Sequence, residues 1–154
     1  MTMNLKNEIT KRYILSSAII LMMLTFTSCA SMATFDQYAY AQTTSIKVDG
    51  LNIMDLAKED FSTHKEAVAA FRTKLQKVYE YEKNRPKNEF TIGLWDKLLD
   101  PEGHLLGGFL KRWESENKLG AAFIRDEKKM VDRAFDMIAG LESKKLKQSD
   151  ITKF

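Results

Sequence analysis

Residues 63–85 read THKEAVAAFRTKLQKVYEYEKNR, and their apolar positions recur at steps of three and four residues. At about 100° per residue, such steps place side chains on one face of a helix. The residues on that face are Val68, Phe71, Leu75, Val78 and Tyr79. The spacing Thr63-x-x-Glu66 fits a capping box at the start. Pro86 ends the stretch, because the residue before a proline avoids helical geometry. The pattern predicts an amphipathic helix over 63–85.

Upstream of this helix, residues 36–60 are rich in apolar side chains, but these do not form one clean stripe. The composition predicts a helix over 36–60, broken near Asp49–Gly50, because glycine disfavours a helix interior.

Downstream, a linker over 86–89 precedes a short apolar stretch that predicts a helix over 92–99. The string Asp100-Pro101-Glu102 resembles a helix start, with an N-cap, a proline at the first helical position and an acid in the first turn. A second helix is therefore expected to run from there to Trp113. Gly107–Gly108 lies inside it and is interpreted as a site of close packing or a kink.

Residues 117–120 predict a turn, and the last helix is expected over 121–145. Lys144, Lys145 and Lys147 suit the negative end of its dipole. Helical spacing with short connections predicts an all-α fold, a small antiparallel bundle of about four to five helices. The expected helical domain spans 36–147, followed by a C-terminal tail over 148–154.

The composition fits one ordinary globular domain. Of the 154 residues, 44% are hydrophobic and 29% charged, which argues against a disordered chain. The formal net charge of +3 falls to +1 when the first 28 residues are left out. No basic stripe of the kind that binds nucleic acid is present in the sequence, so we expect no nucleic-acid partner.

The N-terminus has the order of a secretory signal. Residues 1–12 are polar and net basic, and residues 13–28, YILSSAIILMMLTFTS, carry no charge. The string LTFTSC at 24–29 follows the pattern of an apolar residue, two small residues and a cysteine. It resembles the lipobox of bacterial lipoproteins, with Phe26 where that family usually has leucine.

The resemblance implies that the signal peptide, residues 1–28, is removed and that Cys29 is acylated. Residues 29–35 then form a tether between the membrane and the domain. Ala30 after the cysteine resembles lipoproteins that are not retained at the inner membrane. This implies a cell-envelope lipoprotein facing the periplasm, with the outer membrane preferred.

Three other interpretations stay open. Cleavage after Ala41 fits the small-x-small rule of Ala39-Tyr40-Ala41. The uncharged span over 13–35 is long enough to be an uncleaved membrane anchor. Cys29 could also be an ordinary buried cysteine. As it is the single cysteine, no disulfide within the chain is expected.

The sequence offers little material for catalysis. His64 and His104 are the only histidines, and neither has the spacing of metal ligands with neighbouring acids. No serine, threonine or cysteine lies in a nucleophile-elbow string. We therefore expect no enzyme, no metal and no cofactor. The expected function is a membrane-anchored, non-catalytic interaction or accessory module that faces the periplasm, with another envelope protein as its partner. A small-ligand-binding helical carrier is the alternative, and a hydrolase is the least favoured class.

The densest apolar stretch runs from Leu94 to Trp113, and it supplies the candidate partner-binding residues Trp95, Phe109 and Trp113. Aromatic residues are enriched at the centres of interfaces. Charged neighbours surround Trp113, as they would at an interface rim. The competing interpretation is the bundle core, which helical spacing favours.

Overall fold

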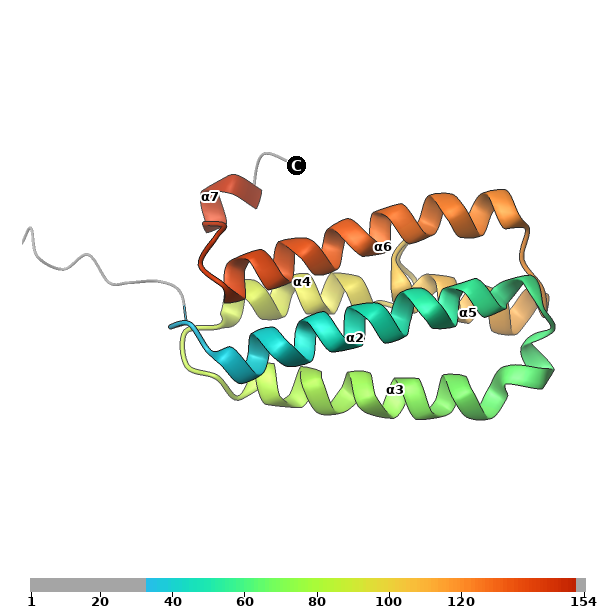
Figure 1. The fold of residues 1–154 in the computed structure, drawn as a ribbon, viewed down its shortest axis with the longest axis horizontal. Coiled ribbons are helices and arrows are strands. Elements are labelled where there is room, and N and C mark those ends of the chain that lie inside the picture. The colour runs from blue at the N-terminus through green and yellow to red at the C-terminus, as the bar shows by residue number, and fades with distance from the viewer. Residues whose placement is uncertain (1–32, 152–154) are drawn as a thin grey trace, which may run out of the picture. The chain divides into compact units, whose positions relative to one another are not determined.

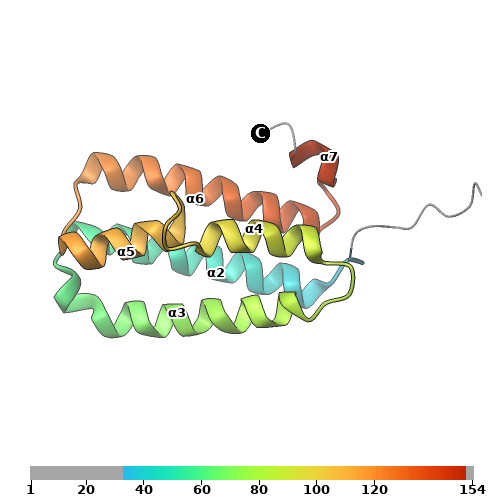
Figure 2. The ribbon, with the colours of Figure 1, turned by 180° about the vertical axis from the view of Figure 1, so that it is seen from behind.

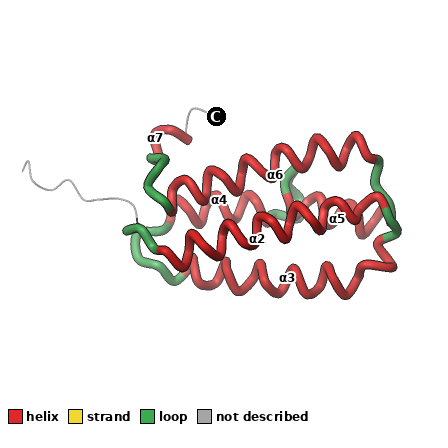
Figure 3. Tube along the Cα trace, in the orientation of Figure 1, coloured by secondary structure: helices red, strands yellow, loops and turns green. Residues whose placement is uncertain are grey.

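The computed structural model describes residues 33–151, and in this range the chain is helical with no β-strand. The predicted signal and Cys29 lie outside the described residues. Figure 3 shows the helices and their connections. They are α2 (Gln37–Asp55), the 3₁₀ turn η1 (Leu56–Lys58), α3 (Phe61–Lys83), α4 (Glu89–Leu99), α5 (Leu106–Glu116), α6 (Ala121–Glu142) and α7 (Gln148–Ile151). The predicted all-α class is confirmed.

The helices form an antiparallel bundle. Helix α2 packs against both α3 and α6, and α4 packs against the same two helices from the other side. Helices α4 and α5 follow one another end to end and together make the fourth long element (Figures 1 and 2). Within residues 33–151, no helix is both long enough and apolar enough to cross a membrane.

Two ends of the bundle matter below. The proximal end, where Ala33 and the start of α2 lie, is formed by residues 33–38, 81–89 and 142–150 (Figure 1). The distal end is formed by residues 55–62 and 114–122.

The core is one continuous apolar cluster, and the face predicted from 63–85 points into it. Val68, Phe71 and Leu75 are buried. The largest fully buried side chains come from the other helices and include Trp95, Trp113, Phe109 and Phe135.

Helix α2 begins at an N-cap and is not broken. The Oδ1 atom of Asp36 accepts hydrogen bonds from the backbone N–H groups of Tyr38, at 2.9 Å, and Ala39, at 3.0 Å. The predicted break near Asp49–Gly50 is wrong, because the helix continues through both residues. A β-carbon on Gly50 would lie 3.1 Å from the ring of Phe71. The glycine therefore serves the close packing of α3 on α2.

Helix α3 begins at Phe61, two residues before the prediction. The predicted capping box does not form, because Thr63 is already helical and its hydroxyl donates to the carbonyl of Asp60 at 2.7 Å. The N–H of Phe61 instead donates to the carbonyl of Asn117 at 2.7 Å. The start of α3 is thus set by a tertiary contact.

Helix α4 begins three residues earlier than predicted, and α5 begins later. Residues 100–105 are a turn, in which Asp100 accepts a hydrogen bond from the N–H of Glu102 at 2.9 Å. The predicted helix start at 100–102 is therefore wrong. A β-carbon on Gly107 would overlap the carbonyl oxygen of Leu99, and one on Gly108 that of Gly103. This confirms close packing at the two glycines.

Helix α6 ends at Glu142, three residues before the predicted end, and Lys144 takes a left-handed conformation with φ of 60°. The lysines predicted to lie at the end of this helix, Lys144, Lys145 and Lys147, therefore lie after it. Part of the expected tail, Gln148–Ile151, forms the short helix α7.

Candidate functional site

The three aromatic residues predicted to meet a partner lie in the core. Trp95 and Trp113 have no exposed surface, and Phe109 has 2%. The indole N–H of Trp113 donates to the carbonyl of Glu59 at 3.1 Å, and its ring meets Phe61 edge to face at 5.2 Å. Trp95 packs edge to face on Phe135 at 5.8 Å. The three rings are therefore enclosed in the folded chain, as the competing interpretation of a bundle core expects.

The same region nevertheless borders a surface groove between α3 and α5. Its volume is about 460 Å³, and its apolar lining includes Leu75, Tyr79, Leu99, Leu106 and Leu110. The spacing of these residues is the spacing of core residues, so the sequence carries no signal that separates the groove from the core.

A second groove of about 490 Å³ lies between the C-terminal half of α2 and the N-terminal half of α6. Leu51, Ala121 and Ile124 supply apolar lining to this α2–α6 groove. Its charged lining consists of Lys58, Arg125, Lys128, Lys129, Asp55 and Asp132. The ammonium of Lys128 pairs with Asp55 at 2.5 Å, which joins α6 to the end of α2.

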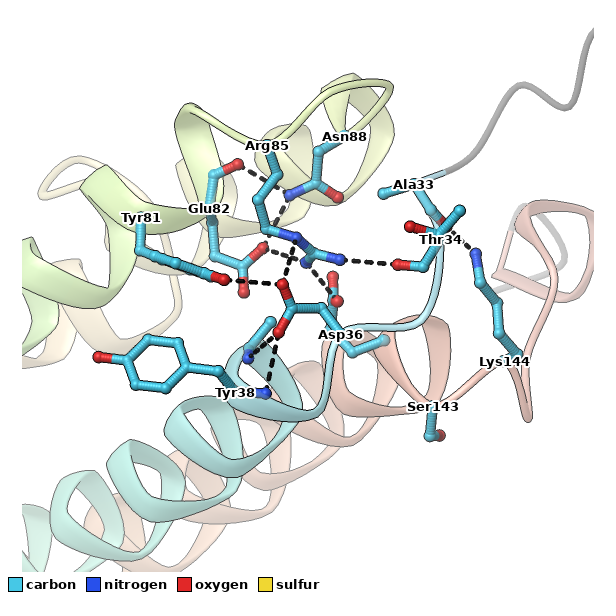
Figure 4. A network of polar contacts seen from close by, with 12 residues as sticks. Ala33, Thr34, Asp36, Tyr38, Tyr81, Glu82, Arg85, Asn88, Ser143 and Lys144 are labelled. Atoms are coloured by element: carbon cyan, nitrogen blue, oxygen red, sulfur yellow. Dashed lines mark hydrogen bonds and ion pairs between the residues drawn. The ribbon is translucent and has the colours of Figure 1, made fainter.

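At the proximal end, polar side chains from α3, from α6, from the segment before α2 and from the connection between α3 and α4 form what we call the Arg85 cluster (Figure 4). Its members are Asp36, Glu82, Arg85, Asn88 and Glu142. One nitrogen of Arg85, Nη1, donates to Glu82 Oε2 at 2.7 Å and also to Glu142 Oε2. Asn88 Nδ2 donates to the same Glu82 oxygen at 2.7 Å. Glu82 is 0% and Glu142 3% exposed, so both carboxylates depend on these donors.

The cluster also holds the segment that leads into α2. The Nη2 atom of Arg85 donates to the carbonyl of Thr34 at 3.0 Å, and the ammonium of Lys144 donates to the carbonyl of Ala33. Tyr81 donates its hydroxyl to Asp36 at 2.7 Å. Residues 33–36 are therefore fixed to the ends of α3 and α6 (Figure 4).

Charge in the cluster is unbalanced, because one guanidinium serves two buried carboxylates. Burial, and then the negative charge of Glu82, raises the pKa of Glu142 above its usual value. The pKa of Asp36 is lowered, chiefly by the hydrogen bond from Tyr81. Glu82 Oε1 and Asn88 Oδ1 are buried and accept no hydrogen bond within the described residues.

The raised pKa of Glu142 predicts a pH-dependent stability. The folded chain keeps this proton at pH values where the unfolded chain has lost it. The stabilisation is complete below the usual pKa of 4.5 and is lost as the pH rises through the folded-state value. Urea unfolding above pH 4.5 should therefore show a falling contribution from Glu142, and Glu142→Gln should make the pH profile flatter.

Glu80→Gln, on the exposed face of α3, is the matched control for losing one carboxylate. An unchanged slope in Glu142→Gln would contradict the assignment. Asp36 acts in the opposite sense and only below its usual pKa of 3.8, so it does not enter this pH range.

Within residues 33–151, no group of three or more metal-ligating side chains comes together. His64 pairs with Glu59 at 2.9 Å, near the start of α3. Comparison of the chain with protein-family models, with curated proteins and with solved structures finds no match. The Arg85 cluster and the two grooves therefore supply the structural evidence for a function.

Proposed function

We propose that the chain is an envelope lipoprotein, acylated at Cys29, whose helical bundle is a non-catalytic interaction or accessory module facing the periplasm. In this proposal residues 1–28 are removed, and the outer membrane is the preferred location.

The observation that carries the proposal is that Arg85, Tyr81 and Lys144 hold residues 33–36 against the bundle. A flexible tether would need no such contacts. Here the carbonyls of Ala33 and Thr34 accept hydrogen bonds from cationic side chains of the bundle. Bonds to charged donors are the stronger kind. In this proposal the C-terminal part of the tether, residues 33–35, is held against the bundle.

The same contacts favour cleavage before Cys29 over cleavage after Ala41. Ala41 lies inside α2, and Ala39 is fully buried. A cut at that point would remove Asp36, the N-cap of α2, together with its contacts to Tyr81 and Arg85. Losing a cap costs about 1 kcal/mol by itself.

The first experiment is mass spectrometry of the mature N-terminus after expression in a bacterium with an outer membrane. We expect a chain that begins at an acylated Cys29. Cys29→Ala should accumulate as an uncleaved precursor without lipid, because the acylated thiol is absent. Ser31→Ala, just beyond the cleavage site, is the matched control and should be processed normally. A wild-type chain that begins at Gln42 would contradict the proposal.

A small-ligand carrier is the second candidate, and the α2–α6 groove is the observation that favours it. Its volume of about 490 Å³ lies in the range of small-molecule sites. An apolar lining edged by four cationic side chains and only two carboxylates suits a ligand with an apolar chain and a carboxylate.

The probe for this candidate is decanoate, with the melting temperature as the readout. A ligand that binds only the folded state raises that temperature with concentration. Ala121→Phe should fill the groove and abolish the rise, because Ala121 lines it and is exposed. Ala122→Phe, an exposed neighbour outside the groove lining, should keep the rise. No rise in the wild type would remove this candidate.

A further inference from the structure

Exposed positive charge gathers at the proximal end of the bundle. The exposed lysines there are Lys83, Lys87, Lys144, Lys145 and Lys147. The exposed acids near them are Glu80 and Glu89. Lys83, Lys87 and Lys145 make no ion pair with any carboxylate of the described residues. Their charge is therefore available to a partner.

The distal end has the opposite balance. Its exposed acids are Asp55, Glu59, Asp60, Glu114 and Glu116, and its exposed lysines are Lys58 and Lys118. The contrast matters because it separates the proximal end from a charged surface that simply covers the whole bundle.

Exposed aromatic side chains gather at the same end as the lysines. Phe35 and Tyr38 are each 54% exposed, and Tyr81 is 37% exposed. Tyr38 and Tyr81 meet edge to face at 4.8 Å. The other exposed large apolar residues of the described range, Val48 and Met130, lie along the bundle. Aromatic rings beside lysines are the combination found at membrane–water interfaces.

We propose that the proximal end is a membrane-facing surface that binds anionic lipid headgroups. The inference rests on the proposed acylation, because Cys29 precedes Ala33 by four residues. Four extended residues reach about 14 Å at most. An acyl anchor at Cys29 therefore keeps the proximal lysines within reach of the headgroups.

The lysines then fix an orientation that the acyl chains alone would leave free. Each lysine close to an anionic surface raises the binding constant for that surface about fivefold, and the effect fades beyond a Debye length. Phe35, which precedes the N-cap of α2, is placed to enter the interface. The distal end and the α2–α6 groove then point away from the membrane, toward a partner or ligand.

The test uses the full chain purified from bacterial membranes and reconstituted in vesicles. Vesicles of phosphatidylcholine alone are compared with vesicles that also contain phosphatidylglycerol. An amine-reactive reagent labels the lysines, and mass spectrometry gives the rate for each. In the anionic vesicles we expect Lys83, Lys87 and Lys145 to react several-fold more slowly than in the neutral ones. Lys58 and Lys118 should react equally in both, and high salt should remove the difference.

A charge-removing variant makes the test sharper. Lys87 holds a left-handed conformation with φ of 59°, which glycine adopts more readily than lysine. Lys87→Gly combined with Lys83→Gln and Lys145→Gln should therefore keep the fold, with its melting temperature as the check. In this variant the protection of Lys147 by anionic vesicles should be lost. The control is Lys65→Gln with Lys118→Gln, which removes exposed charge from α3 and the distal end and should leave the protection of Lys147 intact.

The outcomes separate this inference from the proposal on which it rests. A chain that does not float with either kind of vesicle overturns the acylation. A chain that floats with both, but whose proximal lysines react equally in neutral and anionic vesicles, overturns the headgroup surface and leaves the acylation standing. Protection that survives in the triple variant also overturns it.

Discussion

Arg85→Met should lower the free energy of unfolding by about 3–5 kcal/mol, since removing one partner of a buried ion pair leaves an uncompensated charge. In this bundle two carboxylates, those of Glu82 and Glu142, lose their shared donor at once. Asn88 still donates to Glu82, but Glu142 keeps no donor of comparable charge. Urea unfolding followed by circular dichroism measures the loss.

Two matched variants show whether the effect comes from stranded charge. Lys83→Met removes an exposed cation two residues before Arg85, at the end of α3, and should change stability by less than about 0.5 kcal/mol. Adding Glu82→Gln and Glu142→Gln to Arg85→Met should restore most of the lost free energy of unfolding, because these positions then carry no buried charge. Arg85→Met with near wild-type stability would contradict the role given to the cluster.

The same variant should free the segment before α2. Arg85 contacts the carbonyl of Thr34 and lies 3.7 Å from Asp36. Without it, the peptide bond after Phe35 should become a site of rapid chymotrypsin cleavage under native conditions, because local opening exposes the backbone. The rate of that cleavage reports on the tether separately from the global stability.

The helices could be predicted from the sequence because burial imposes a period on each of them. Val68, Phe71 and Leu75 recur at helical spacing and face the core. The helix starts were harder to predict, because contacts between residues that are distant in sequence determine where the helices begin. The carbonyl of Asn117 satisfies the N–H of Phe61, and no local pattern near Thr63 reveals that contact. Gly50 was misleading for the same reason, since its role depends on Phe71 of another helix.

The Arg85 cluster could not be predicted from the sequence, because its residues resemble the charged residues of an ordinary solvent-exposed helix face. Arg85 stood out only as the residue before Pro86, and Glu82 resembled the other charges of a solvated face. The spacing of Glu82 and Arg85 does suggest a local pair. Its burial depends on Glu142, which is 57 residues from Arg85, and only the antiparallel return of α6 brings that residue to the proximal end.

Trp113→Ala should lower the free energy of unfolding by about 3–5 kcal/mol, the range for truncating a large buried aromatic residue. The ring has no exposed surface, packs on Phe61 and His64, and so joins α5 to the start of α3. Guanidinium unfolding gives the value. If Trp113 were instead an anchor for a partner, the variant would keep its stability and lose only binding.

Substitution by phenylalanine separates the packing of the ring from its hydrogen bond. Trp113→Phe gives up the bond from the indole N–H to the carbonyl of Glu59, whereas Trp95→Phe gives up none, because the Trp95 N–H has no partner within the described residues. Both variants lose a similar volume from a fully buried position. Trp113→Phe should therefore be the more destabilising of the two, by about 1 kcal/mol, the net value of one hydrogen bond. An equal or reversed order would mean that the bond to Glu59 contributes nothing and that packing alone holds Trp113 in place.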